Sequence, residues 1–126
     1  MLVRHVSYRN LAPYDFKGLK IKELTPDGLA SASVAEVEIN PGVKHEMARS
    51  LKSDKIYICT EGEIGFHVEN EYIRMEPGDL LFIQGGEWFS YQNDKDNMAR
   101  VILVHVPPFD LESEQFRDTK TSGGIK

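Results

Sequence analysis

The regular spacing of turn residues is the feature of this chain that most constrains its fold. Turn sequences such as TPDG, NPG, EPGD and GGE interrupt short apolar or alternating runs about every eight to twelve positions. Glycine permits positive φ, proline presets φ, and asparagine or aspartate tolerates the left-handed region. We predict strands over residues 18–24, 33–39, 55–60, 63–68, 71–75, 79–84, 89–93 and 99–106. Many short strands with almost no helix indicate an all-β sandwich or barrel.

The two ends of the chain carry weaker patterns. Only residues 110–118 (DLESEQFRD) have a helical period, which predicts one short C-terminal helix. The last residues, 121–126, are small and polar, so we expect a flexible tail. With 126 residues the chain is expected to form one domain: N-terminal strands in 1–32, a barrel in 33–110, and the short helix and tail in 111–126.

The amino-acid composition limits the kinds of partner that this chain is expected to bind. The formal net charge is −5, from 20 acidic and 15 basic residues, whereas nucleic-acid binders have basic clusters. The single cysteine, Cys59, excludes an internal disulfide and fits a reducing compartment. No apolar run approaches the roughly eighteen residues of a membrane span. We therefore expect a soluble cytoplasmic protein without nucleic-acid or membrane partners.

Residues 44–55 contain the densest group of basic side chains. Four lysines or arginines lie there, but Glu46 and Asp54 are interleaved with them. Mixed charge of this kind is typical of a solvated loop, and we predict one before the strand at 55–60. No nucleophile elbow (GxSxG), P-loop or GxGxxG fingerprint occurs anywhere in the sequence, so hydrolase and nucleotide-phosphate sites have no support.

The turn spacing matches two motifs of a known family. The first consists of a glycine, a His-any-His pair, a glutamate and a second glycine. Gly42, Ala48, Ser50, Lys55 and Gly62 occupy those positions in this chain, with four residues between the second histidine position and the glutamate position.

The second motif follows later in the chain with no gap in its spacing. It consists of a glycine, a Pro-any-Gly turn, a histidine and an asparagine, and the corresponding residues are Gly78, Gln84, Gly86, Phe89 and Asn93. Over about residues 33 to 110 the chain thus resembles a single-domain cupin. The resemblance implies a jelly-roll barrel of two antiparallel sheets.

The same resemblance bears on metal binding. In metal-binding cupins the two histidines and the glutamate of the first motif, with the histidine of the second, hold a divalent ion. Ala48, Ser50, Lys55 and Phe89 stand there instead. Zinc, iron and manganese prefer imidazole, thiolate or carboxylate ligands, and none of these four residues supplies one. We therefore predict that the family's metal site is absent and that no cofactor is needed.

The direction of Lys55 is left open by the sequence. Lys55, Tyr57 and Cys59 share one face of the predicted strand, and Ile56 and Ile58 share the other. Apolar content alone favours the isoleucines inside, whereas the motif spacing favours Lys55 inside. A shift of one residue would turn Asp54 inward and restore a carboxylate.

A rebuilt metal site is the alternative to a lost one. It would use His45 with Asp54 or Glu46, because His45 lies three residues before the first ligand position. His67 alternates with apolar neighbours and is expected to point outward, and His105 is expected to be a core histidine of the last strand.

A pocket at the barrel mouth is the remaining candidate for function. We predict ligand-binding positions at six residues, with Lys55 also the candidate catalytic group: Ser50, Lys55, Tyr57, Trp88, Phe89 and Tyr91. A desolvated lysine binds anions or serves as a base or Schiff-base amine, and aromatic faces suit sugars and flat rings. The alternative for the aromatic residues is that they only fill a small barrel.

Three functional hypotheses follow. The first is a metal-free cupin that binds a small anionic or carbohydrate-like molecule, as a sensor, an accessory protein or a non-metal isomerase. The second is a metal-dependent isomerase or dioxygenase with a rebuilt site. The third is a packed scaffold that acts through its surface. The resemblance also implies a homodimer in which the N-terminal strands cross to the partner.

Overall fold

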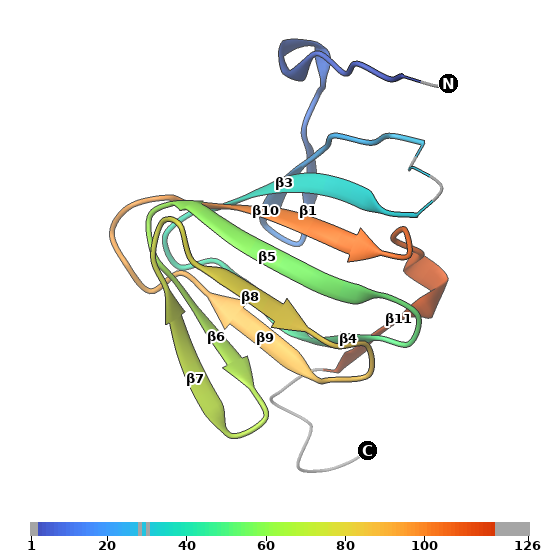
Figure 1. The fold of residues 1–126 in the computed structure, drawn as a ribbon. Coiled ribbons are helices and arrows are strands. Elements are labelled where there is room, and N and C mark those ends of the chain that lie inside the picture. Colours follow the sequence, from blue (N-terminus) through green and yellow to red (C-terminus); the bar gives the residue numbers. More distant parts are fainter. Residues whose placement is uncertain (1–2, 28, 30, 118–126) are drawn as a thin grey trace.

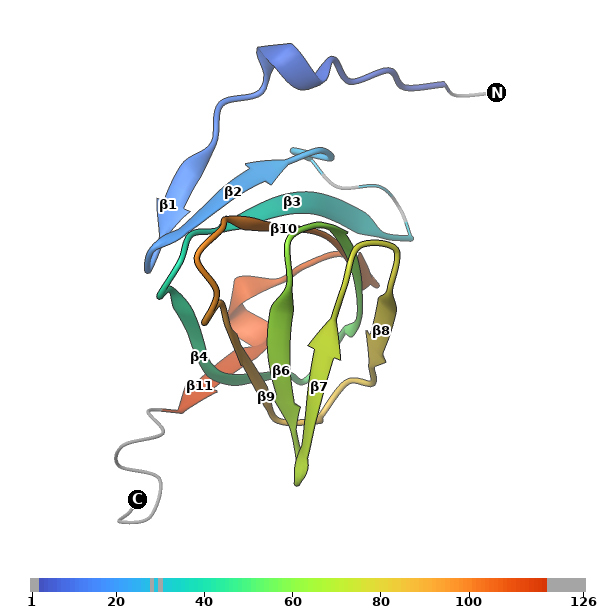
Figure 2. The ribbon, with the colours of Figure 1, turned by 90° about the vertical axis from the view of Figure 1, so that its left-hand side faces the viewer.

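Two antiparallel sheets packed face to face make up this protein (Figures 1 and 2). The structure is a computed structural model that describes residues 3–27, 29 and 31–117. In sheet order the first sheet contains β1 (Tyr14–Phe16), β2 (Leu19–Glu23), β3 (Ser33–Ile39), β10 (Ala99–Val106), β5 (Asp54–Glu61) and β8 (Leu80–Ile83). The second contains β11 (Glu114–Arg117), β4 (Lys44–Ser50), β9 (Phe89–Gln92), β6 (Ile64–Val68) and β7 (Glu71–Met75). The predicted all-β jelly roll is confirmed.

The burial pattern of strand β5 shows which of its side chains face the interior of the barrel. Lys55, Tyr57 and Cys59 are buried, whereas Ile56 and Ile58 lie on the outer face of the first sheet. Of the two interpretations that the sequence left open, the structure agrees with the one from motif spacing, whereas apolar content alone would have given the wrong face. Side chains in a strand alternate between faces, so this one choice fixes the direction of every side chain in β5.

Residues 44–50 form strand β4, so the prediction of a solvated loop there is wrong. The strand pairs with β9, and its register shifts between His45 and Ala48. Such a bulge adds a residue to one strand and redirects the neighbouring side chains. As a result both His45 and Ala48 face the interior although they are three residues apart, while Lys44 remains exposed. Because this segment contains many charged residues, its sequence does not show the alternation of inward and outward side chains that a strand has.

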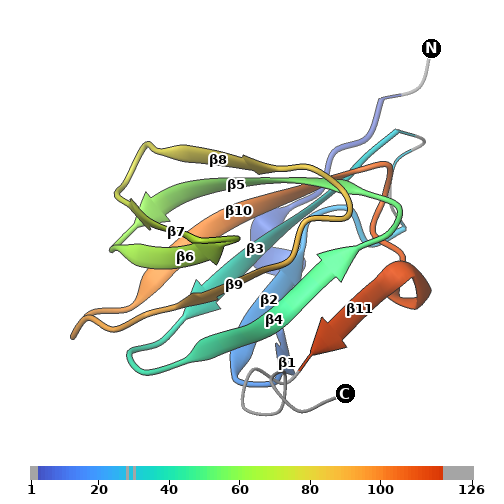
Figure 3. The same cartoon turned by 90° about the horizontal axis from the view of Figure 1, so that it is seen from below.

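The helix predicted over 110–118 is also wrong. A single 3₁₀ turn, η2, spans Leu111–Ser113, and strand β11 follows it and pairs with β4 (Figure 3). The Asp110 carboxylate accepts a hydrogen bond from the Glu112 amide, which caps the short turn. Residues 114–117 form backbone hydrogen bonds with the edge of β4. These bonds outweigh the weak helical preference of the segment. The predicted tail at 121–126 lies outside the described residues.

The N-terminal strands extend the first sheet. β2 pairs with β3 of the same chain, and β1 pairs with β2. Ahead of them a 3₁₀ turn, η1 (Tyr8–Asn10), lies on the outside of the barrel (Figure 2). The Tyr8 hydroxyl donates to Glu36 at 2.6 Å, and the Lys22 ammonium lies 3.8 Å from the Tyr8 ring centre. Among the described residues no helix is long and apolar enough to cross a membrane.

Two residues that agree with the family motifs, Gly62 and Asn93, stabilise turns and loops. Gly62 has φ +71°, and a Cβ there would lie 2.5 Å from the Met98 carbonyl oxygen, so only glycine fits. The buried Asn93 amide donates to the carbonyls of Ile39 and Asn97. Both residues therefore stabilise loops at one end of the barrel.

Candidate small-molecule site

A cavity of about 460 Å³ lies between the two sheets. Its walls come from β1, β2, β3, β5 and β10 on one side and from β4, β9 and β11 on the other. Apolar side chains form most of the wall, among them Phe16, Ile21, Val37, Leu103 and Phe116. The polar or aromatic lining side chains include His45, Lys55, Tyr57, Tyr91, His105 and Glu114. This volume falls within the range of small-molecule pockets.

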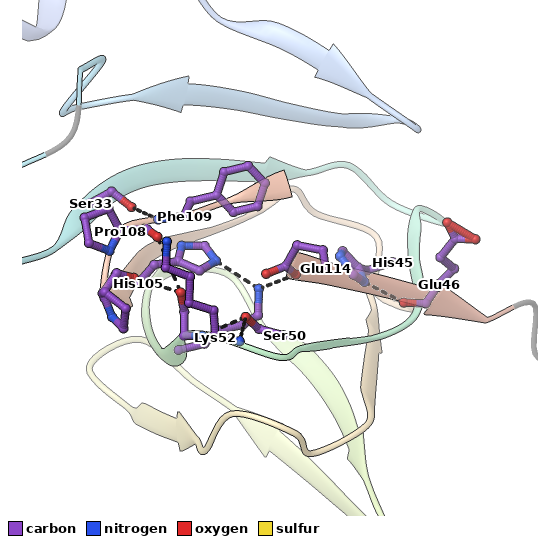
Figure 4. Close-up of polar contacts among 12 residues, drawn as sticks. Ser33, His45, Glu46, Ser50, Lys52, His105, Pro108, Phe109 and Glu114 are labelled. Atoms are coloured by element: carbon purple, nitrogen blue, oxygen red, sulfur yellow. Dashed lines mark hydrogen bonds and ion pairs between the residues drawn. The ribbon is translucent and has the colours of Figure 1, made fainter. Parts of the chain in front are cut away.

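A buried ion pair lies at the wall of this cavity. The Lys55 ammonium is 2.9 Å from Glu114 Oε1, and the two side chains are 6% and 4% exposed (Figure 4). The ammonium is also 2.9 Å from His105 Nε2. Since an ammonium only donates hydrogen bonds, His105 accepts through Nε2 and carries its proton on Nδ1. Three strands, β5, β10 and β11, bring these groups together.

Burial governs the protonation of this cluster. It lowers the pKa of His105 to about 3, and the nearby Lys55 charge adds to the effect, so this imidazole is neutral at pH 7. Burial also lowers the pKa of Lys55, while the Glu114 carboxylate acts in the opposite direction. The 2.9 Å contact between Lys55 Nζ and Glu114 Oε1 has the geometry of an ammonium–carboxylate ion pair.

One atom of the cluster lacks a partner. Glu114 Oε2 is buried and has no hydrogen-bond partner among the described residues. A buried carboxylate oxygen without a donor costs free energy, so native structures rarely keep one. Because Glu114 lines the cavity, its carboxylate has acceptor capacity left for a hydrogen-bond donor of a bound molecule.

His45 forms a second polar position at the wall. Its Nδ1 is 2.6 Å from the Glu46 carbonyl oxygen (Figure 4). A carbonyl only accepts, so Nδ1 carries the proton and Nε2 remains an acceptor. Burial lowers the pKa of His45 to about 4, which keeps the ring neutral. The ring stacks on Tyr91 with 4.7 Å between centroids, and this contact fixes its orientation.

Two tyrosines lie beside His45. Tyr57 and Tyr91 are buried, and their ring centroids are 5.6 Å apart in an edge-on arrangement. Burial raises the pKa of both hydroxyl groups well above the usual range, so both stay protonated at neutral pH. The two hydroxyls also interact with each other, so one O–H of the pair is left to donate to another group.

Three of the predicted site residues lie away from the cavity wall. Ser50 Oγ accepts from the Ser53 amide at 2.8 Å and holds the β4–β5 turn. Trp88 lies against two arginine side chains, Arg49 and Arg117, at 4.7 and 4.3 Å. Phe89 is buried but is not a lining residue, and its ring centre is 5.6 Å from the Lys55 ammonium. Lys55, Tyr57 and Tyr91 do line the cavity.

The four family ligand positions lie in the interior. Ala48, Ser50, Lys55 and Phe89 are all buried, and Ala48 pairs with Phe89 across β4 and β9. Over the part of the chain that the structure describes, no group of three His, Cys, Asp or Glu side chains forms a metal-binding cluster. Because these four side chains include no imidazole or carboxylate, they do not fit the divalent ion of metal-binding cupins.

The residues of the alternative metal site do not converge. Asp54 Oδ1 accepts a hydrogen bond from the backbone amide of Gly85 at 2.8 Å, where β5 begins and β8 has ended. The Glu46 carboxylate forms an ion pair with Lys17. Only His45 of the three lines the cavity, and His67 is exposed as predicted.

Sequence reasoning missed Glu114 and underrated His105. Glu114 was assigned to a helix ahead of a flexible tail, and no local pattern connects it with Lys55, 59 residues earlier. The one available signal was the need of a buried lysine for an anionic partner. His105 was treated as a core histidine with a backbone partner, but it contacts the Lys55 side chain.

Comparison with known proteins agrees with this architecture. The family model described as Cupin_2, the cupin domain, matches residues 35–105. A search of curated proteins finds no match. A Streptomyces PAC13 variant with uridine has a similar structure, with TM-score 0.80, 15% identity, and coverage of 94% of this chain and 93% of that one.

Two further solved structures are similar. KdgF from Halomonas sp. gives a TM-score of 0.78 at 16% identity, over 86% of this chain and 99% of that one. The polyketide cyclase RemF from Streptomyces resistomycificus gives 0.73 at 18% identity, over 83% and 80%. At this level of identity the likeness concerns the fold alone.

Proposed function

We propose, from the premise that this chain belongs to the cupin domain family, that it binds a small anionic or carbohydrate-like molecule in the barrel cavity without a metal ion. The observation that carries the proposal is the buried Lys55–Glu114 pair at the cavity wall, with Glu114 Oε2 lacking a partner. Lys55 occupies the position of the family's metal-binding glutamate. A fixed ammonium there replaces part of the electrostatic role of a metal.

The cavity also contains groups for proton transfer. His45 Nε2 is an unprotonated acceptor held in place by the Glu46 carbonyl, and Lys55 is an ammonium whose pKa is lowered by burial. A base and an acid in one pocket are suited to isomerisation or elimination. We therefore propose acid–base chemistry, with Lys55 as the proton donor.

One similar protein supports this assignment. Pac13 is described as a nucleoside dehydratase, and three of its variant structures hold uridine. The residues replaced in those variants are two tyrosines and one histidine. The same residue types, Tyr57, Tyr91 and His45, line the cavity here.

The two other hypotheses have less support. The rebuilt metal site needs Asp54 or Glu46 beside His45, and both carboxylates have other partners. The packed scaffold needs a filled interior, which disagrees with a cavity of about 460 Å³.

Two measurements on untagged protein test the proposal. Elemental analysis by mass spectrometry, after incubation with zinc, manganese, iron and nickel and then desalting, is expected to give far less than one equivalent of each metal. Calorimetric titration with a panel of sugars, nucleosides and their phosphates is expected to find a ligand, and Ala35→Phe, which fills the cavity, is expected to abolish its binding.

The control variant is His67→Phe, at an exposed strand position outside the cavity, and it should leave binding unchanged. Near one equivalent of a metal that is lost in a His45→Ala variant would overturn the metal-free proposal. Binding that survives in Ala35→Phe would place the ligand elsewhere.

We also propose that the chain forms a homodimer. The outer face of β10, β5 and β8 carries a continuous apolar patch of Ile56, Ile58, Leu80, Phe82, Ile102 and Val104. Leu80 and Phe82 are 60% and 54% exposed. A second copy of the same face would cover them, since exposed apolar patches mark interfaces. Light scattering should give twice the chain mass, reduced to one mass in Phe82→Glu; a monomeric wild type would rule the dimer out.

A further inference from the structure

We propose that the ligand of the cavity is a neutral polyhydroxylated molecule rather than an anion, and that one of its hydroxyl groups donates a hydrogen bond to Glu114 Oε2. This inference rests on the proposed function and chooses between the two ligand classes that it leaves open. Three observations support it: the charge of the cavity wall, its free acceptors, and its aromatic surface.

The charge of the wall does not favour an anion. Among the described residues that line the cavity, Lys55 is the only one with an ammonium or guanidinium group, and Glu114 already neutralises it at 2.9 Å. Among the other charged lining residues, Glu23 accepts a hydrogen bond from Tyr14, and Asp27 is 89% exposed and forms an ion pair with Arg4. Both imidazoles, on His45 and His105, are neutral. A bound phosphate or carboxylate would therefore find no unpaired positive charge at the wall to offset the cost of its desolvation.

The free acceptors of the wall require donors on the ligand. Glu114 Oε2 lacks a partner, and His45 presents Nε2 as an acceptor because Nδ1 donates to Glu46. An ionised carboxylate or phosphate brings only acceptors to these two atoms. A hydroxyl group donates one hydrogen bond and accepts others, so it satisfies Glu114 Oε2 and accepts from the remaining Lys55 proton at the same time.

The aromatic surface fits the same class of ligand. His45 stacks on Tyr91, and Tyr57 packs edge-on against Tyr91. Phe16 and Phe116 lie 6.1 Å apart at the side where β1 faces β11. Flat apolar faces beside a few fixed polar atoms bind the C–H face of a sugar ring while its hydroxyls reach the polar atoms.

Matched pairs of compounds test the inference on the wild-type protein. The pairs are D-ribose with ribose 5-phosphate, D-glucose with glucuronate, and uridine with uridine 5′-monophosphate, titrated by calorimetry at pH 7.5. In each pair that binds, the neutral member is expected to bind about tenfold more tightly or better. Tighter binding of the charged member in those pairs would overturn the inference but leave the proposed function standing. If none of the six compounds binds, the proposed function itself fails, and the inference fails with it.

A variant that changes only charge sharpens the test. Glu114→Gln keeps the size of the side chain, removes the negative charge and leaves Lys55 without its ionic partner. Inorganic phosphate, followed by the shift in melting temperature, is expected to have no specific effect on the wild type and to stabilise Glu114→Gln. A wild type stabilised by phosphate, with the effect lost in Lys55→Met, would show an anion site and overturn the inference.

The control for this variant is Asp110→Asn, which removes an exposed carboxylate near Lys52, 3.7 Å away, and should leave the response to phosphate unchanged. If Glu114→Gln does not fold, the wild-type titrations and Lys55→Met still decide the question.

Discussion

Two ionic clusters on opposite faces of the first sheet have very different surroundings. On the outer face Arg100 of β10 contacts the carboxylates of Glu38 and Glu61 at 2.9 and 2.7 Å, and its side chain is 27% exposed. On the inner face the Lys55–Glu114 pair is almost fully buried and adjoins the cavity. Water screens the first cluster, whereas nothing screens the second.

The comparison separates a structural role from a functional one. Arg100 links three neighbouring strands, β3, β10 and β5, through ion pairs with Glu36, Glu38 and Glu61, although its buried Nε has no hydrogen-bond partner among the described residues. The inner pair leaves a carboxylate oxygen and an ammonium proton for something else. A protein that needed only to tie β11 to the barrel would do so at lower desolvation cost with apolar side chains.

The largest expected effect is on the inner pair. Lys55→Met leaves the Glu114 carboxylate buried without its partner, and we expect a loss of about 3–5 kcal/mol in the free energy of unfolding. The double variant Lys55→Met with Glu114→Gln removes both charges and should recover most of this loss. Urea denaturation of the single and double variants measures the coupling energy; additive effects would show that the two side chains do not interact.

The second prediction concerns pH and the two buried histidines. The folded pKa values of about 4 for His45 and about 3 for His105 lie below the ordinary value of 6.5. Between pH 6.5 and 4 the unfolded chain therefore binds protons that the folded chain excludes. Stability is complete above pH 6.5 and falls as the pH drops toward 4, by an amount on the order of a few kcal/mol.

Chemical denaturation at pH 7.5, 5.5 and 4.5 measures this dependence. His45→Gln should flatten the curve, and His67→Gln, at an exposed position, should leave it unchanged. Equal slopes in the wild type and in His45→Gln would mean that His45 is protonated in the folded state.

The smallest expected effect is on the outer cluster. Arg100→Gln removes contacts that water already screens, so we expect a loss of about 1 kcal/mol, and a smaller one at high salt. Thermal unfolding at low and high ionic strength measures it. A loss as large as that of Lys55→Met would remove the contrast between the two clusters.

Much of the fold follows from local patterns, and much of the site does not. Turn glycines such as Gly62 and Gly78 mark the ends of strands, so eight of the eleven strands in the described residues were predicted, all but β1, β4 and β11. The inward direction of His45 was not, because it depends on a bulge that forms only when β4 pairs with β9. Strand β11 was mistaken for a helix because its partner, β4, lies far away in sequence.

The sequence by itself determined the barrel and the loss of the family's ligands at positions 48, 50, 55 and 89, since both depend on residue type and spacing. Only the tertiary structure decided that Lys55 points inward and meets His105 and Glu114, which lie 50 and 59 residues further along the chain. The physical reason is that a buried charge takes its partner from whatever strand the fold brings beside it. The spacing of residues along the chain does not indicate which strand that will be.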